Sequence, residues 1–576
     1  MGLLRKADLI LLHPPTVYDF RKEPIFWGPI SDVVPSSYVF EMYPVGFNSI
    51  TGYLVKNKIE TRVINLAYRM LTDSKYDCRK IIEGLKPTAF GIDLHWLPHA
   101  HGAIEIAKIC KEVHPRIPVI LGGYSATYFH AEILNSYPRV VDYILRGDST
   151  EESLLELMRC IKNNSPIDHI PNLSWLDDSG QIRSNPIVCS SDSADKYYND
   201  YLCMFRMAFK YMDIRSQIPF IGWWEYPITA IMTVRGCTQN CAICGGSAHA
   251  MNGLCNRKKP SYCTPGKVIR DVKRMASYTS APIFLIGDLN QAGEDYASSV
   301  LDGLKSLRLK NDIVLELFNY APESFFRRAS RACSNLNFEM SPESHDEEVR
   351  RLAGKHYKNS EIEQNIEWAL SYGAKKFDIY YMTGIPGQTY NSVMDTIDYC
   401  EHLMKRFDSR LMPFISPLAP FIDPSSLVWD HTEKYGYKLL YKTLEEHRQA
   451  LLQPSWKYIL SYETKWMNRD QIVDATYEAG RRLNLLKIKY GQIDKDKGEC
   501  TDRRIKAAMD LNGRIDRILL EEPEEEKRRA RLMELKKEME VYSLSTICDT
   551  DEIKWRVIGR RYKILKILKD CLFDGS

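Results

Sequence analysis

The chain has 576 residues, of which 44% are hydrophobic and 27% are charged. This length is too great for one hydrophobic core and indicates about three domains, while the composition is that of an ordinary globular protein. Its 78 basic and 75 acidic residues leave a net charge of +3, which excludes the strong positive field of a typical nucleic-acid-binding protein.

Targeting and redox signals are also weak. No apolar run approaches the roughly 18 residues that a membrane-spanning helix needs, and Leu9 to Leu12 is too short for the core of a signal peptide. The 15 cysteines are mostly scattered singly and form no disulfide framework. These features predict a cytoplasmic protein without a transmembrane segment, and they leave its oligomeric state open.

The first part of the chain alternates strands with helices. Strands are predicted at 8–13, 61–65, 89–93, 118–121 and 143–146, and helices at 46–56, 101–113 and 150–161. Strands separated by helices predict a doubly wound parallel sheet, so we expect an α/β, Rossmann-like domain over residues 1–165. A linker is predicted over residues 166–222.

Small and polar residues gather where these strands end. Ligands of such sheets bind at the carboxyl ends of the strands, and glycines there let a ligand approach the backbone closely. The alternative is an α/β domain without a ligand, whose glycines only cap strands. The candidate ligand contacts are Pro14, Tyr43, Gly46, His95, Trp96, Gly122, Gly123, Ser125, Thr127, Arg146 and Gly147.

A cysteine motif follows the apolar, β-branched run at 228–234. Cys237, Cys241 and Cys244 have the spacing C-x3-C-x2-C. Three thiolates on one short loop can hold three irons of a [4Fe-4S] cluster and leave the fourth iron open to a small molecule. The alternative is structural zinc, for which His249, Cys255 or Cys263 could supply a fourth ligand.

Three later strands end in distinctive motifs. Strand 281–286 ends in Gly287-Asp288, strand 336–340 leads into Ser341-Pro342-Glu343, and strand 377–383 ends in Gly384-Ile385-Pro386-Gly387. Together with the cysteines, these segments resemble the radical S-adenosylmethionine (SAM) superfamily over residues 223–426. The resemblance implies a partial (β/α)6 TIM-type barrel, a [4Fe-4S] cluster in place of zinc, and SAM contacts from Ile243, Gly287, Asp288, Ser341, Glu343, Gly384 and Pro386.

The order of the first two domains resembles the cobalamin-dependent radical SAM enzymes, in which a cobalamin-binding domain comes first. Cobalamin domains that provide a histidine ligand carry D-x-H-x-x-G after their first strand. Here Asp93-Leu94-His95 follows the third strand, and Pro98 replaces the glycine. We therefore expect cobalt without a histidine ligand. His95 and Trp96 are candidates to lie beneath the cobalt, or they serve only to cap a turn and fill the core.

The last part of the chain, residues 427–576, shows helical patterns at 433–453, 470–484 and 524–541 and is predicted to be a helical domain. The stretch 553–573 combines helically spaced apolar residues with a basic face. Such a stretch can touch a membrane or an acidic partner, but we expect a helix docked on the core.

The resemblance implies a class B-type methyltransferase that acts on an unactivated carbon. In that family, a 5′-deoxyadenosyl radical removes a hydrogen atom, and the carbon then takes a methyl group from methylcobalamin. The implied partners are an external electron donor and a substrate, either a small molecule or a polypeptide side chain such as one in methyl-coenzyme M reductase. The alternatives are a non-methylating enzyme, such as a cyclase, and a cobalamin- or redox-sensing Fe-S protein. No catalytic side chain is predicted.

Overall fold

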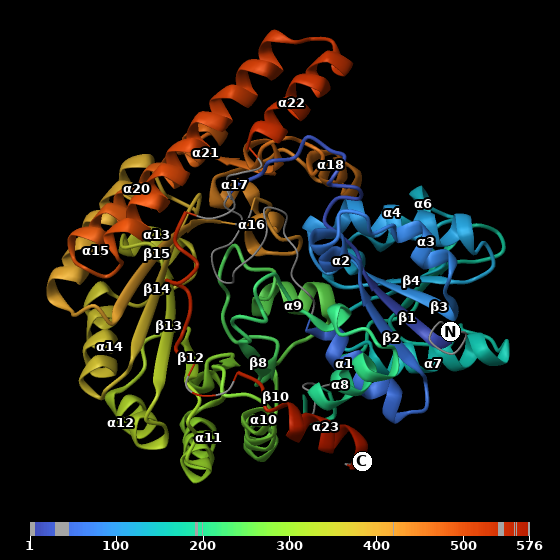
Figure 1. The fold of residues 1–576 in the computed structure, drawn as a ribbon, viewed down its shortest axis with the longest axis horizontal. Coiled ribbons are helices and arrows are strands. Elements are labelled where there is room, and N and C mark those ends of the chain that lie inside the picture. Colours follow the sequence, from blue (N-terminus) through green and yellow to red (C-terminus); the bar gives the residue numbers. More distant parts are fainter. Residues whose placement is uncertain are drawn as a thin grey trace.

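The computed structural model describes residues 6–28, 45–189, 194–197, 200–418, 420–539, 547–557, 559 and 561–573. Two large sheets, both mainly parallel, form the two halves of the molecule, and a long pair of helices rises above the second (Figure 1). Tyr43, a predicted ligand contact, lies outside the described residues.

The N-terminal sheet has the strand order β2-β1-β3-β4-β5-β6-β7. Its first five strands are parallel, and the alternation of strands and helices that predicted them places helices on both sides (Figure 1). Cover on both faces explains why β1 and β3 are buried almost throughout. The doubly wound sheet is confirmed. Its elements are β1 (Lys6–His13), α1 (Gly46–Lys56), β2 (Thr61–Asn65), α2 (Leu66–Thr72), α3 (Cys78–Glu83), β3 (Lys86–Asp93), α4 (Ala100–Val113), β4 (Val119–Gly122), α5 (Tyr124–Tyr128), α6 (His130–Ser136), β5 (Tyr143–Leu145) and α7 (Glu151–Asn163).

The segment 166–222, predicted to be a linker, contains regular structure. β6 (Leu173–Leu176) and β7 (Ile182–Ser184) extend the first sheet in antiparallel fashion. The helix α8 (Tyr201–Lys210) packs against α1. Most of this segment therefore belongs to the folded body of the first domain.

The second sheet is a six-stranded partial barrel with the order β15-β14-β13-β12-β11-β8, and all five of its strand pairs are parallel. Helices follow the strands and cover the outer side (Figure 1). The carboxyl ends of the strands consequently share one mouth, where the active sites of such barrels lie. The elements are β8 (Thr229–Met232), β9 (Val234–Arg235), α9 (Ala248–Cys255), β10 (Ser261–Tyr262), α10 (Pro265–Tyr278), β11 (Ile283–Ile286), α11 (Glu294–Leu307), β12 (Ile313–Leu317), α12 (Glu323–Ala332), β13 (Leu336–Glu343), α13 (Glu347–Leu352), α14 (Asn359–Ser371), β14 (Lys376–Thr383), α15 (Tyr390–Arg406) and β15 (Leu411–Pro417).

The C-terminal part is mainly helical, as predicted, but one predicted helix is wrong. The range 433–453 divides because Gly436, with φ +70°, ends α17 in the left-handed conformation that glycine adopts at helix ends. No described helix is both long enough and apolar enough to cross a membrane. The elements are α16 (Leu427–Asp430), α17 (Thr432–Tyr435), β16 (Tyr437–Leu439), α18 (Leu444–Ala450), α19 (Trp456–Ile459), β17 (Tyr462–Thr464), α20 (Arg469–Lys489), α21 (Lys495–Glu521), α22 (Glu525–Met539) and α23 (Ile564–Phe573).

A C-terminal segment without regular secondary structure, which contains Ile553 and Trp555, lies against the barrel sheet. Ile553 packs with Tyr380 and Phe414, and Trp555 packs with Val314 of β12. The C-terminal region therefore completes the core of the barrel.

Candidate functional site

The cysteine loop begins directly after β9. The Cys237 sulfur accepts a hydrogen bond from the Gln239 amide at 3.3 Å, and the Cys244 sulfur accepts one from the Gly246 amide, also at 3.3 Å. Backbone N–H groups aimed at sulfur are a feature of Fe-S sites, where they tune the cluster. The donor set therefore fits a cluster.

The spacing of the three sulfurs argues against one zinc ion. Tetrahedral zinc with Zn–S bonds of about 2.3 Å needs its sulfur ligands within about 4 Å of one another. Among the described residues, these three cysteines do not form a group whose ligand atoms all lie within 4.8 Å. Cysteines that each hold a different iron lie further apart, as a [4Fe-4S] cluster requires.

The three alternative zinc ligands are all engaged elsewhere. The His249 imidazole contacts the Asp430 carboxylate at 2.8 Å, Cys255 is buried in an apolar cluster with Met251, and the Cys263 thiol donates to the Met232 carbonyl at 3.6 Å. No fourth protein ligand is thus supplied by these residues.

A buried ion pair lies beside the cysteine loop. Lys355 contacts the Glu343 carboxylate through Oε1 at 3.1 Å and also donates to the Ser341 carbonyl. The other carboxylate oxygen of Glu343, Oε2, is buried and has no hydrogen-bond partner within the described chain. A buried acceptor of this kind costs free energy unless a ligand supplies a donor, so Glu343 fits a role in SAM binding. Burial raises the pKa of the neighbouring Cys241 thiol to about 11, and the positive charge of Lys355 opposes that rise.

Lys355 is a site residue that the sequence analysis did not identify. It follows Gly354, whose φ is +93° and at which a Cβ would lie 2.5 Å from the Asn240 carbonyl oxygen. Glycine is required there because this turn packs directly on the cysteine loop. The sequence carried no signal for this packing, since Gly354 and Asn240 lie more than a hundred positions apart.

At the end of β11, Gly287 and Asp288 are held by internal contacts. The Gly287 amide donates to Glu316 at 2.5 Å, and the Asp288 carboxylate accepts from the amides of Asn290 and Phe318 at 2.8 and 2.9 Å. These contacts leave the Gly287 carbonyl oxygen as the group that could meet a SAM amino group. Burial raises the pKa of Glu316 to about 7, a second feature that the sequence did not reveal.

At the end of β14, Gly384 is held from the C-terminal part of the chain. Its φ is +87°, its amide donates to Gln388 at 2.8 Å, and its carbonyl accepts from the Tyr437 hydroxyl at 2.6 Å. A Cβ at this position would lie 2.8 Å from the Tyr462 hydroxyl oxygen. Ile243 and Pro386, the remaining predicted SAM contacts, are buried, while Ser341 is half-buried.

The structure brings several predicted cobalamin contacts together at the ends of β3, β4 and β5. The Thr127 hydroxyl donates to the Gly123 carbonyl at 2.8 Å and accepts from the Gly147 amide at 3.0 Å. The Ser125 amide donates to the His95 carbonyl at 3.3 Å. These contacts fix three strand-end loops against one another.

The two adjacent glycines in this region have different surroundings. A Cβ on Gly123 would lie 2.3 Å from the His95 Cα, so Gly123 is required for the loops to pack. A Cβ on Gly122 would find no protein atom closer than the Leu145 carbonyl oxygen at 3.9 Å. Gly122 thus leaves open space at the strand edge, as a cobalamin cradle would need, and Gly46 likewise has nothing within 4 Å.

Asp93 contacts two histidines near the carboxyl ends of β1 and β3. Its carboxylate contacts His13 Nδ1 at 3.1 Å and His95 Nδ1 at 2.9 Å. The His95 ring stacks on His99 and contacts Trp96, which is about one-third exposed. Of the other predicted contacts, Pro14 is buried, and Arg146 donates to the Asn185 carbonyl beside β7.

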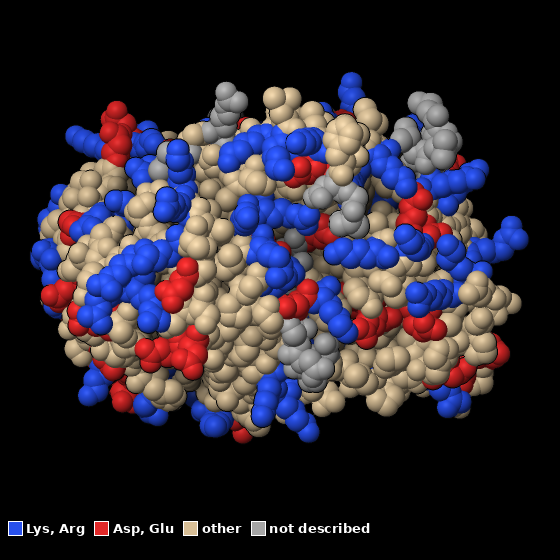
Figure 2. Space-filling model, turned by 90° about the horizontal axis from the view of Figure 1, so that it is seen from below, with Lys and Arg blue, Asp and Glu red and all other residues tan. Residues whose placement is uncertain are grey.

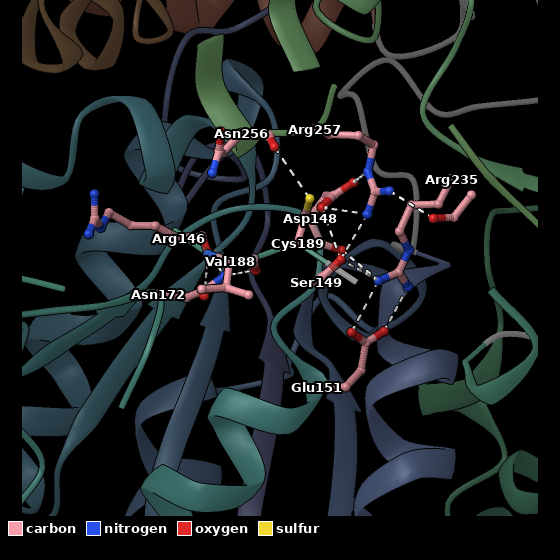
Figure 3. A network of polar contacts seen from close by, with 11 residues as sticks. Arg146, Asp148, Ser149, Glu151, Asn172, Val188, Cys189, Arg235, Asn256 and Arg257 are labelled. Carbon is pink, nitrogen blue, oxygen red and sulfur yellow. Dashed lines mark hydrogen bonds and ion pairs between the residues drawn. The ribbon is translucent and has the colours of Figure 1, made fainter. Parts of the chain in front are cut away.

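Two buried ion pairs join the first domain to both sides of the cysteine loop (Figure 3). Arg235, two residues before Cys237, contacts both oxygens of Glu151 at 2.8 and 3.2 Å. Arg257 contacts both oxygens of Asp148 at 2.5 and 3.1 Å. Burial favours the neutral form of Glu151, but Arg235 outweighs it and holds the pKa of that carboxyl below its ordinary value. These pairs fix the strand-end loops of the first sheet against the cysteine loop.

Replacing Asp148 with asparagine should destabilise the protein by about 3–5 kcal/mol, because it removes the carboxylate that pairs with the buried Arg257 guanidinium. The side chains of Asp148 and Arg257 are 3% and 1% exposed. Denaturant unfolding of the apo-protein measures the effect. The matched control is Asp177→Asn, which breaks the surface pair with Arg183 and should have a much smaller effect. Equal effects of the two changes would contradict a special role for the buried pair.

Comparisons with known proteins agree with this geometry. A family model described as the B12 binding domain matches residues 32–155, and the model of the radical SAM superfamily matches residues 231–400. Each match covers the segment whose strand ends and cysteines are described above.

Two curated relatives match part of the chain. The hopanoid C-3 methylase of Methylococcus capsulatus is 22% identical over 261 residues, which are 45% of this chain and 45% of that protein. An uncharacterized methyltransferase of Pyrococcus horikoshii is 25% identical over 247 residues, or 42% of this chain and 46% of that protein. The chain thus matches less than half the length of either relative.

Solved structures share the fold. The radical SAM methyltransferase TsrM from Kitasatospora setae has a TM-score of 0.53 and 14% identity, and the match covers 76% of this chain and 79% of TsrM. The cobalamin-dependent radical SAM enzyme OxsB has a TM-score of 0.55 and 13% identity, over 99% of this chain and 81% of OxsB. The chain thus contains a B12 binding domain followed by a domain of the radical SAM superfamily.

Proposed function

We propose that the protein is a methyltransferase that uses cobalamin and SAM to methylate an unactivated carbon. The main support for the proposal comes from two buried ion pairs. Arg235–Glu151 and Arg257–Asp148 join the strand ends of the B12 binding domain to the cysteine loop. An enzyme that works with both cofactors needs the two sites in a fixed relation. The names of both curated relatives, a methylase and a methyltransferase, support methyl transfer.

In this proposal, Cys237, Cys241 and Cys244 bind three irons of the cluster. When bound, the cluster supplies an electron that cleaves SAM, SAM supplies the radical that removes a hydrogen atom, and cobalamin supplies the methyl group. The Glu343 Oε2 atom accepts a hydrogen bond from SAM, and the contact with Lys355 holds the carboxylate in position. The strand-end loops at Gly122 and Thr127 hold the corrin.

Incubation of the reconstituted protein with SAM, a chemical reductant and substrate tests the proposal. We expect 5′-deoxyadenosine and S-adenosylhomocysteine in equal amounts, because one SAM is cleaved and one donates a methyl group for each turnover. Deoxyadenosine without S-adenosylhomocysteine would indicate a non-methylating enzyme such as a cyclase. Neither product would indicate a cobalamin- or redox-sensing protein.

Two substrate classes have support. The sequence analysis favours a polypeptide, with methyl-coenzyme M reductase as one example, whereas the name of the hopanoid methylase favours a lipid. SAM that carries a deuterated methyl group would separate them, because mass spectrometry then locates the label in peptides or in extracted lipids.

The lower face of the cobalt is tested by electron paramagnetic resonance of the Co(II) form. Since the D-x-H-x-x-G motif is absent, we expect no nitrogen superhyperfine splitting and no change in His95→Ala. The competing possibility is that His95 binds the cobalt. Its Nδ1 atom contacts Asp93, so Nε2 is the nitrogen that would bind the metal. Splitting that disappears in His95→Ala would make His95 the lower ligand.

A further inference from the structure

The C-terminal helix α23 has one face fixed to the protein and one face in solvent. Ile567 and Cys571 pack with Leu202 of α8 and Tyr278 of α10, and Arg206 of α8 donates to the Cys571 carbonyl at 3.4 Å. Figure 1 shows α23 at the lower edge of the molecule, beside α8 and α10. The helix is therefore docked, as the sequence predicted.

The opposite face of α23 exposes large apolar side chains. Leu565, Leu572 and Phe573 are 82%, 75% and 77% exposed. The end of α8 and the turn after it add Phe209 and Met212, which are 46% and 80% exposed. We call these five side chains the terminal face. Monomeric proteins rarely expose a group of this size without a partner.

Basic residues surround the terminal face. On α23, Lys566 and Lys569 are exposed between the leucines, and Asp570 is the one acidic residue of that helix. The adjacent α10 adds the exposed Arg270 and Lys273, while its Lys267 is paired with Asp271, the one acidic residue of that helix. Figure 2, which views the molecule from below, shows Lys and Arg side chains spread widely over this side. The charge of the surroundings is thus complementary to an anionic surface.

An aromatic cluster lies at the start of the same region. The Tyr562 hydroxyl donates to the carbonyls of Trp223 and Trp224 at 3.2 Å, and the three rings contact one another with centroids 5.6–5.8 Å apart. Both tryptophans and Tyr562 are only partly buried. Rings with one apolar side and one polar group favour the boundary between lipid and water.

We infer that the terminal face docks the protein on an anionic lipid surface. Exposed leucines and phenylalanine on one face of a helix, with lysines beside them, are the pattern by which an amphipathic helix enters the headgroup region of a membrane. The acidic headgroups attract the lysines and arginines of α23 and α10. This inference does not depend on the proposed methyltransferase activity.

Cosedimentation of the purified full-length chain with lipid vesicles tests the inference. We expect binding to vesicles of phosphatidylcholine that contain one quarter phosphatidylglycerol, and much weaker binding to phosphatidylcholine alone. Lys566→Gln with Lys569→Gln should weaken binding to the anionic vesicles about fivefold for each lysine. Leu565→Glu with Leu572→Glu should weaken it by at least about a hundredfold, because two apolar side chains are lost from the contact and two negative charges are added.

The control is Leu520→Glu on α21, because Leu520 is 87% exposed and belongs to the helix pair that rises at the opposite side of the molecule in Figure 1. It should bind vesicles as the unchanged protein does. Circular dichroism checks that each variant is folded. Two results would overturn the inference: failure of the unchanged chain to sediment with anionic vesicles, or equal binding by the double glutamate variant.

A second copy of the chain is the competing occupant of the terminal face. Sedimentation velocity without lipid separates the two cases. A dimer that dissociates in Leu565→Glu with Leu572→Glu would assign the face to self-association and overturn the lipid proposal. A monomer under the same conditions supports the proposal.

Discussion

Replacement of Cys241 with alanine should abolish both the iron content and the formation of 5′-deoxyadenosine. Anaerobically reconstituted protein should contain about four irons and four sulfides per chain, and the variant close to none. The cluster needs all three thiolates, and no nearby side chain replaces Cys241, because His249, Cys255 and Cys263 are engaged with other groups. Iron and sulfide assays and the ultraviolet-visible spectrum provide the measurements.

The matched control is Cys500→Ala, which removes an exposed cysteine from α21. It should leave iron content and deoxyadenosine formation unchanged. A protein that is active with bound zinc and without iron would refute the cluster assignment.

The parts of the fold that the sequence predicted well are those with a local signal. Short apolar runs located β1 and β2, and the strand–helix alternation predicted the parallel order of the first sheet. The cysteine loop could be predicted from the sequence equally well, since its chemistry depends on three residues within eight positions. Here the family resemblance and the residue pattern agreed, and the family models of both domains match the chain.

Other elements had weak local signals. β6 and β7 are short strands of four and three residues at one end of the first sheet, and the range around them was predicted to be a linker. The 27-residue helix α21 was not predicted, because its charged sequence has few apolar positions. The segment that contains Ile553 and Trp555 lacks helix or strand periodicity, and only its packing on the barrel sheet explains its burial.

The site was predictable only in part, for the same reason. The strand-end motifs indicated Glu343 and Gly384 as candidates but gave no sign of Lys355, which follows the turn at Gly354 that packs on the cysteine loop. The ion pair of Asp148 with Arg257 joins residues 109 positions apart. Such contacts follow from the tertiary fold. They fix the first domain against the cysteine loop, whereas the sequence predicted only the order of the two domains along the chain.

A valine at position 122 should abolish cobalamin binding and leave the cluster intact. Gly122 ends β4, next to loops that Thr127 and Gly147 hold together. The protein itself accommodates a side chain there, because the nearest atom to an added Cβ is 3.9 Å away. A valine would therefore fill the open space and exclude the ligand without disturbing the fold. Corrin absorbance after reconstitution and gel filtration, together with iron content, measures the two effects separately.

Two other glycines provide the controls for this prediction. Gly513→Val on α21 also finds no atom within 4 Å and should retain both cofactors, which excludes a general effect of valine. Gly123→Ala should instead impair folding, because φ is +115° and the added Cβ would lie 2.3 Å from the His95 Cα. If Gly122→Val kept its full corrin absorbance, the ligand would not occupy the space above β4. The strand-end loops would then serve to hold the first domain against the cysteine loop, and the corrin would have to bind elsewhere on the carboxyl edge of the sheet.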